Sequence, residues 1–337
     1  MKTPPISIND IAKQLKVSAS TVSRALNDHP EINVKTKKKV MAYARKVGYR
    51  PNILALSLKS KRTYTIGLII PEITHHFFSS VISGVEEMAY GNGYRVMICQ
   101  TSENKSREEI NIQALLDHRV DGVLVSVSKD TYDVNHFSRA FENNIPVVFY
   151  DRISDDMVTD RVITDDYEGS HSAVKHLIER GSHNILHLAA PKHLLVGKER
   201  HRGYVKALEE HNISYTEKLV LLCDTSREVN KSRDHILKLI RNGVNGIFAV
   251  NDFTAIAVMQ LLQAEGYKIP ADVAIAGFGD DPIATIVNPA LTTVEQKGYA
   301  MGKESVKLLI ERIEKPDEII PPRIKVFESK LKIRAST

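Results

Sequence analysis

The chain has 337 residues, 42% of them apolar and 26% charged, which is long enough for two or three folded domains and typical of a globular protein. No apolar run reaches the roughly 18 residues that a membrane helix needs, and the first residues lack the apolar segment of a secretory signal, so we expect a cytoplasmic protein without membrane contact. Residues 1–62 hold 14 Lys and Arg against three acidic residues, whereas the remainder is net negative.

The basic N-terminal segment, here called the head, carries the signals of three short helices. Ser7 followed three residues later by Asp10 is typical of a helix start, and Ser18 provides a second start. A third helix is expected from near Asn33 and should end at Gly48. Because a polyanion is attracted by such a head and repelled by the acidic remainder, the charge pattern indicates nucleic-acid binding.

The second of these helices has the character of a helix that reads DNA. Val22 and Leu26 form its inward i, i+4 pair, which leaves small polar residues and Arg24 on the outer face. Such a helix fits the major groove, where an arginine can donate two hydrogen bonds to guanine. The alternative is an ordinary three-helix bundle with a solvated basic face, but charge, helix starts and outward small residues together favour DNA binding.

The stretches SINDIAKQLKVSASTVSRALN (7–27) and KVGYRPNILALSLKSKRTYTIGLIIP (46–71) resemble the LacI family of bacterial transcription regulators. The resemblance covers essentially the whole chain. One departure is Lys16, which stands where many members have glycine, so a residue with a Cβ must make the turn before the second helix.

The resemblance implies which residues of the head touch DNA. Ala19, Ser20 and Arg24 match base-reading positions, and because the first two are short, much of the direct readout falls on Arg24. Residues on the phosphate side also match. The complete set that we assign to DNA contact is Ser18, Ala19, Ser20, Thr21, Ser23, Arg24, Asn27, Thr36, Tyr49, Asn52, Ala55 and Leu58.

Residues 50–62 form a short segment between the head and the rest of the chain. The segment is too short to be a stable helix alone, and a flexible linker is one interpretation. The resemblance implies a hinge helix that forms on the DNA and pairs with its twin in the minor groove. In that arrangement Leu58 wedges between base steps and Ala55 lies beside it.

From residue 65 onward, apolar runs alternate with helical segments. The runs lie at 65–70, 94–99, 121–127, 145–151, 184–190, 218–223, 245–250 and 273–278, and the helices at 77–90, 106–118, 167–180, 198–211, 229–241, 252–265 and 298–313. Continuous Val/Ile/Leu runs separated by helices are typical of parallel strands buried on both faces. We therefore predict an all-α helix–turn–helix domain followed by an α/β core of two doubly wound lobes, which the resemblance identifies as periplasmic-binding-protein-like, type I.

The predicted domain boundaries follow from this pattern. The head is 1–49 and the hinge is 50–62. The acidic polar stretch 154–161 is taken as the break between the lobes, and two late segments near 290–297 and 320–334 are expected to cross between them. The N-terminal lobe is then 63–161 with 292–321, and the C-terminal lobe is 162–291 with 322–337.

Polar residues follow several predicted strands, which is where parallel sheets bind small ligands. Asp151 follows the fourth strand, Asn251 follows the seventh, and Arg200 begins a helix after the fifth. The resemblance implies that these three contact an effector in the cleft between the lobes. For Arg200 the alternative is a surface salt bridge.

Two further groups of candidates are less sharply defined. Gly279 stands where sugar-binding members usually have Asp, so we assign the carboxylate role to Asp280 and leave Asp281 as the alternative. Ring-bearing residues near the strand ends could stack on a ligand or simply pack in the core. The predicted effector set is His75, Phe77, Phe78, Asp151, Arg200, Asn251, Phe253 and Asp280.

Neither a metal, nor a cofactor, nor catalysis is predicted. The pairs His75–His76 and His183–His187 lack a cysteine or paired carboxylates that would complete a metal site. Phosphate-binding and hydrolase motifs such as GxGxxG, GxxxxGK[ST] and GxSxG do not occur. The two cysteines, Cys99 and Cys223, lie far apart in apolar stretches, which is typical of reduced, buried thiols.

These observations together predict a cytoplasmic, homodimeric transcription regulator, a repressor controlled by a small effector. It should bind palindromic double-stranded operator DNA, and the resemblance makes a sugar or sugar derivative the expected effector and the helices 77–90 and 106–118 the dimer surface. The alternatives are a ligand-binding carrier for a transporter, which the basic head disfavours, and an enzyme using Asp and Arg in the cleft, for which no nucleophile–base motif exists.

Overall fold

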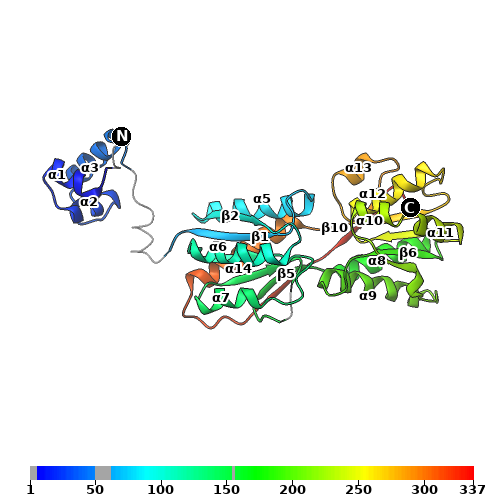
Figure 1. The fold of residues 1–337 in the computed structure, drawn as a ribbon. Helices are drawn as coiled ribbons and strands as arrows, with labels where there is room; N and C mark the ends of the chain where they lie inside the picture. The colour runs from blue at the N-terminus through cyan, green and yellow to red at the C-terminus, as the bar shows by residue number, and fades with distance from the viewer. Residues whose placement is uncertain (1–5, 50–61, 154–155) are drawn as a thin grey trace. The chain divides into compact units, whose positions relative to one another are not determined.

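A computed structural model describes residues 6–49, 62–153 and 156–337. The chain forms two compact units, one up to Thr63 and one from Tyr64 to Thr337 (Figure 1). The hinge contacts predicted at Asn52, Ala55 and Leu58 lie outside the described residues. None of the helices in the described ranges is long and apolar enough to cross a membrane.

The head consists of α1 (Ile8–Leu15), α2 (Ala19–Leu26) and α3 (Val34–Lys46). The predicted starts are confirmed: Ser7 and Asp10 form a reciprocal capping box on α1, and Ser18 and Asn33 cap α2 and α3 through their side-chain oxygens. Lys16 has a φ of +52°, so this lysine adopts the left-handed conformation that favours glycine.

A small apolar core joins the three helices of the head. Ile11 from α1, Val22 and Ala25 from α2, and Val40 and Ala44 from α3 are buried together. Leu26, predicted to be inward, is only half-buried against this cluster. The outer face of α2 is thereby fixed as the side that carries Ser20 and Arg24, both exposed.

The first sheet of the larger unit is entirely parallel, in the order β11-β5-β4-β3-β1-β2. Its strands are β1 (Thr65–Ile70), β2 (Arg95–Gln100), β3 (Gly122–Val125), β4 (Val147–Tyr150), β5 (Asp160–Thr164) and β11 (Ile324–Phe327). One face packs on α5 (His76–Gly91) and α14 (Gly298–Glu314), and the other on α6 (Lys105–Asp117) and the η1–α7 segment (Asn135–Phe137, Ser138–Glu142).

The second sheet has the order β12-β10-β9-β8-β6-β7, and only the β10–β12 pair is antiparallel. Its strands are β6 (Ile185–Ala189), β7 (Val220–Leu222), β8 (Gly246–Ala249), β9 (Ala274–Gly279), β10 (Thr292–Glu295) and β12 (Lys330–Lys332). Helices α8 (Asp166–Glu179) and α9 (Leu195–Glu210) cover one face; α10 (Ser226–Lys231), α11 (Arg233–Arg241) and α12 (Asp252–Ala264) cover the other. The short η2 (Glu217–Leu219) and α13 (Ile283–Ile286) complete the described elements.

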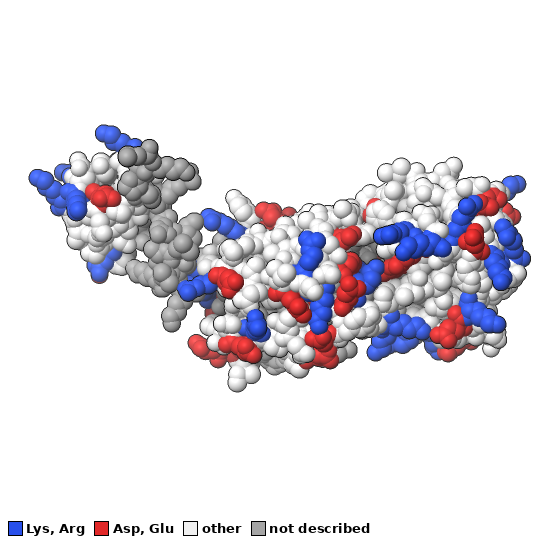
Figure 2. All heavy atoms as spheres, in the orientation of Figure 1, with Lys and Arg blue, Asp and Glu red and all other residues white. Residues whose placement is uncertain are grey.

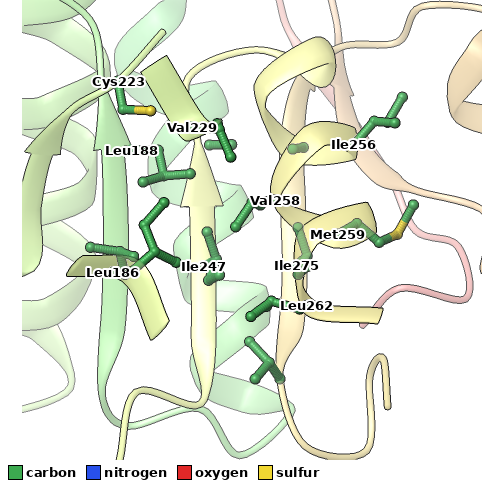
Figure 3. Close-up of a cluster of buried hydrophobic side chains, with 14 of the residues drawn as sticks. Leu186, Leu188, Cys223, Val229, Ile247, Ile256, Val258, Met259, Leu262 and Ile275 are labelled. Atoms are coloured by element: carbon green, nitrogen blue, oxygen red, sulfur yellow. The ribbon is translucent and has the colours of Figure 1, made fainter. Parts of the chain in front are cut away.

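The core under α12 shows why the apolar runs were recognisable as strands. Ile247 on β8 and Ile275 on β9 belong to one cluster with Val258, Met259 and other side chains from the covering helices (Figure 3). All of these side chains are buried. Strands covered by helices on both faces need apolar residues at successive positions, which produces the continuous runs seen in the sequence.

The predicted fold class is confirmed. The strand pairing, however, places the crossings between the lobes a few residues later than the predicted boundaries. β5 pairs with β4 in the first sheet, β10 with β9 in the second, and β11 with β5 in the first. The chain therefore crosses between lobes after β5, after β10 and after β11, not at 161, 291 and 321. These strands are short and mix polar with apolar residues, so they do not stand out as apolar runs.

Candidate functional site

The head presents one exposed, basic helical surface. Lys and Arg side chains project from it with few acidic side chains among them (Figure 2). At the start of α2, the Ser18 hydroxyl caps the helix and lies 2.7 Å from the Ser20 hydroxyl and 2.8 Å from that of Thr21. These three hydroxyls lie at a helix N-terminus, where backbone N–H groups favour an anion such as a DNA phosphate.

The remaining predicted DNA contacts of the head all retain some exposed surface. Arg24 and Asn27 are exposed, and Ala19, Ser23, Thr36 and Tyr49 are partly exposed. The Arg24 guanidinium is not free, because its Nη1 lies 2.9 Å from Oε2 of Glu31. Both partners are more than half exposed, so this pair is weak enough to be exchanged for another anion or a base edge.

The larger unit contains a cavity of about 170 Å³ at the carboxyl ends of its strands. The structure brings seven of the eight predicted effector residues to its wall: His75, Phe77, Phe78, Asp151, Arg200, Asn251 and Phe253. The rings of His75 and Phe253, which come from different lobes, meet edge to face with centroids 5.3 Å apart. The cavity is therefore shared by the two lobes, as parallel strand ends on both sides predict.

Arg200 is the most firmly held cation of the cavity wall. Its Nε and Nη2 lie 2.7 and 2.6 Å from Oδ1 of Asp166, its Nη1 donates to the carbonyl oxygen of Val250 at 2.6 Å, and its Cζ lies 3.7 Å above the centre of the Phe278 ring. The surface salt bridge considered for Arg200 is thus excluded, since the residue is only 6% exposed. Burial raises the pKa of Asp166 to about 6, although Arg200 acts in the opposite direction.

The structure corrects the prediction that Asp280 supplies the cavity carboxylate after the strand 273–278. Asp281, not Asp280, lines the cavity. Gly279 and Asp280 have φ values of +138° and +53°, and this turn directs the Asp280 carboxylate to Arg334, 2.6 Å away. The backbone N–H of Asp281 instead donates to Asp252, and these two left-handed residues were not recognisable from the sequence.

Asp252, at the first turn of α12, is a cavity residue that the sequence analysis did not select. It accepts hydrogen bonds from the Thr293 hydroxyl and, at 2.8 Å, from the Asp281 N–H. Burial raises the pKa of Asp252 to about 6. Asn251 beside it lines the cavity, but its amide already bonds to the Thr254 N–H and the Asp224 carbonyl.

Other cavity residues were also missed. Lys129 and Asp224 join the lobes, with Nζ 2.8 Å from both carboxylate oxygens, and Nη1 of Arg152 lies 2.7 Å from both oxygens of Glu103. Gln296 contributes a buried Nε2, and its side chain interacts with the carboxylate of Asp151. Lys129 and Asp224 come just after β3 and β7, so the strand-end rule could have found them.

Asp151 is buried at the inner wall of the cavity. Its backbone adopts a φ of +57° directly after β4. Burial raises the pKa of its carboxyl group, and the nearby Arg152 and Arg200 lower it. The arrangement offers carboxylate acceptors, an amide donor and aromatic faces, which together can bind a small polar molecule. No group of three metal-ligating side chains occurs in the described part of the chain.

Comparison with known proteins supports both units. Residues 7–52 match the model for bacterial regulatory proteins of the lacI family, and residues 174–337 match that for a periplasmic binding protein-like domain. A ribose operon repressor of Halalkalibacterium halodurans is 33% identical over 310 residues, which cover 92% of this chain and 91% of that protein. The transcriptional repressor PurR of Aliivibrio fischeri is 32% identical over 316 residues, covering 92% and 93%.

Among solved structures, the transcriptional regulator CelR in complex with cellobiose is similar over 98% of this chain and 100% of its own. The TM-score is 0.75 and the sequence identity 27%. The similarity therefore extends over the whole length of the chain, through both compact units.

Proposed function

Because the chain belongs to the lacI family of bacterial regulatory proteins and is a ligand-responsive, DNA-binding regulator of transcription, we propose that it is a cytoplasmic, dimeric repressor whose effector is a sugar or sugar derivative. The observation that carries the effector proposal is the shared cavity, in which Asp151 and Arg200 face a space flanked by Phe77 and Phe253. Carboxylates, an arginine and aromatic faces are the groups that bind sugar hydroxyls and sugar ring faces.

The relatives support the same ligand class. One is named a ribose operon repressor, and one structure contains cellobiose. We propose the effector contacts to be His75, Phe77, Phe78, Asp151, Arg200, Asn251, Phe253 and, in place of Asp280, Asp281. We propose no catalytic role for this cavity.

For DNA binding, we propose that the hydroxyls at the start of α2 contact phosphates while Arg24 reads a base. The hinge residue Leu58 is proposed to wedge between base steps. Replacing it by alanine should reduce operator bending in a gel or FRET assay without changing effector affinity, and unchanged bending would exclude the wedge.

Dimerisation is proposed through the side of the first lobe that carries α5, β2 and α6. Tyr90, Ile98 and Ile110 on these elements are 78%, 44% and 67% exposed. Several exposed large apolar residues on neighbouring elements indicate an interaction surface. A dimer would present two heads to the two halves of a palindrome. Sedimentation analysis of Ile110→Asp should show a shift toward monomer, and a dimer of unchanged stability would rule out this surface.

The effector proposal is tested with the full chain. Thermal shifts are measured with a panel of sugars, sugar derivatives and nucleobases, and the effect of each hit on operator affinity is then measured by fluorescence anisotropy. A ligand at a hundred times its dissociation constant should stabilise the protein by about 2.7 kcal/mol. A nucleobase that binds where every sugar fails would replace the sugar proposal.

A further inference from the structure

The cations in the cavity wall are already neutralised by acids of the protein. Both oxygens of Asp224 lie 2.8 Å from Lys129 Nζ, and both oxygens of Glu103 lie 2.7 Å from Arg152 Nη1. All four residues line the cavity and are largely buried. Neither cation therefore offers an uncompensated positive charge to a ligand.

Arg200 is engaged in the same way. Two of its nitrogens face Asp166 and the third donates to the carbonyl of Val250. The lysines and arginines among the described residues of the cavity wall are Lys129, Arg152 and Arg200. Each of these three side chains has an acidic partner. Of the two histidines in the wall, His75 lies 3.3 Å from Glu72 and His76 is exposed.

Acidic groups, by contrast, are in excess. No ion pair joins Asp151, Asp252 or Asp281 to a cation within the ranges that the structure describes. The surplus carboxylates make the cavity electronegative, and in a site of low dielectric constant a second negative charge is strongly repelled. A phosphate or carboxylate on the ligand would meet this repulsion without a free guanidinium or ammonium group to offset it.

The uncharged polar groups of the cavity suit hydroxyl groups. A hydroxyl can donate to the buried Asp151 carboxylate and can accept from the amide of Gln296, which lies beside that carboxylate. Phe77 and Phe253 supply apolar faces on the same wall. Donors, acceptors and ring faces are thus present, and an anion-binding group is not.

We propose that the cavity selects uncharged, polyhydroxylated effectors against phosphorylated or carboxylated ones, and that Glu103 and Asp224 are the residues that set this selectivity by occupying Arg152 and Lys129. The proposal rests on the proposed function, because it takes this cavity to be the effector site. The proposal goes beyond the proposed function because it excludes sugar derivatives that carry a negative charge and names the two acidic residues responsible.

The test releases each cation in turn in the full chain. Asp224→Asn and Glu103→Gln keep the shape of the side chain and remove its charge, and Asp317→Asn, at an exposed position, is the matched control. The probe is inorganic phosphate, titrated by calorimetry at constant ionic strength. Phosphate that binds to the basic head contributes equally to all four proteins and therefore cancels in the comparison.

Each cavity variant should bind phosphate at least tenfold more tightly than the original chain, and Asp317→Asn should not. A merely structural role of the two acids cannot produce such a gain. If Asp224→Asn does not fold because the contact between lobes is lost, Glu103→Gln decides alone, since its ion pair lies within one lobe. Absence of a gain in the folded variants would overturn the proposal.

A second measurement separates this proposal from the proposed function. Thermal shifts of the original chain are compared for D-ribose with ribose 5-phosphate and for D-glucose with glucose 6-phosphate. A phosphorylated sugar that stabilises the chain more than its parent sugar would refute the selectivity and leave the sugar effector intact. If the cavity variants gain phosphate binding while no sugar or sugar derivative binds, the sugar effector fails, and only the exclusion of anions by Glu103 and Asp224 stands.

Discussion

Arg24 and Glu31 form an exposed ion pair on the head, with 2.9 Å between Nη1 and Oε2. The pair spans from α2 to the loop before α3, so it holds the proposed base-reading side chain along the protein surface. Because exposed pairs of this kind contribute about 0–1 kcal/mol, DNA can displace Glu31 at little cost.

Removal of the reading side chain gives the first prediction. Arg24→Ala should weaken binding to a selected operator by about 1–3 kcal/mol and binding to random duplex by much less, because a base contact is lost. Glu31→Gln is the matched control and should leave operator affinity unchanged or slightly raised. Fluorescence anisotropy with both duplexes measures this, and equal losses on both would remove the base-reading role.

The buried pair of Arg200 and Asp166 gives the second prediction. Arg200→Met should lower the free energy of unfolding by about 3–5 kcal/mol, because Asp166 is left buried without its cation. Asp166→Asn should also destabilise, and the double variant should lose clearly less than the two single losses together. Urea denaturation provides the values, and simple additivity would show that the two side chains do not act as a pair.

His187 gives a prediction on pH. It is buried on β6 against Tyr204 and Phe248, and burial lowers its pKa to about 3. The unfolded chain binds a proton at this residue below about pH 6.5, whereas the folded chain does so only near pH 3, so folding stability must fall as the pH decreases through this window.

The measurement compares wild type with His187→Phe between pH 7.5 and 5. Asp166 and Asp252, whose pKa values are raised to about 6, act in the opposite direction between about pH 3.8 and 6, but they are present in both proteins. The stability of wild type relative to the variant should fall by up to about 1.4 kcal/mol per pH unit below pH 6.5. A difference that is independent of pH would contradict the buried neutral imidazole.

The contact between α5 and α14 gives a prediction on packing. A Cβ added to Gly302 would lie 2.3 Å from the carbonyl oxygen of Val81, and one added to Gly84 would lie 2.0 Å from that of Tyr299. Because these neighbours are backbone atoms, Gly302→Ala should destabilise the chain by about 1–3 kcal/mol. Gly91→Ala, which meets nothing within 4 Å, is the control. Equal melting temperatures would show that the helices can separate without loss.

Much of the fold was predictable because its signals are local. The capping box of Ser7 and Asp10 fixed the start of α1, and the apolar run 65–70 coincides with β1. β5, β10 and β11 were missed because strand pairing across the sheets, not their own sequence, makes them strands. Likewise, the helix predicted at 229–241 is divided at Ser232 into α10 and α11.

Only those cavity residues that directly follow a strand could be predicted from the sequence. Asp151 and Asn251 directly follow strands, so topology places them together. The choice between Asp280 and Asp281 depended on two left-handed residues, and the neutralising partners of Lys129 and Arg152 come from distant parts of the chain. Such tertiary relationships carry no local signal.

The most direct test of the central claim is a salt titration of DNA binding by the full chain. A duplex is selected from a random library, and its dissociation constant is measured by anisotropy between about 50 and 200 mM salt, with and without the effector found in the thermal screen. The account predicts that the logarithm of affinity falls steeply and linearly with the logarithm of salt concentration, and that the effector shifts affinity for the selected duplex. If no duplex is enriched, or if affinity responds to neither salt nor effector, the account is wrong.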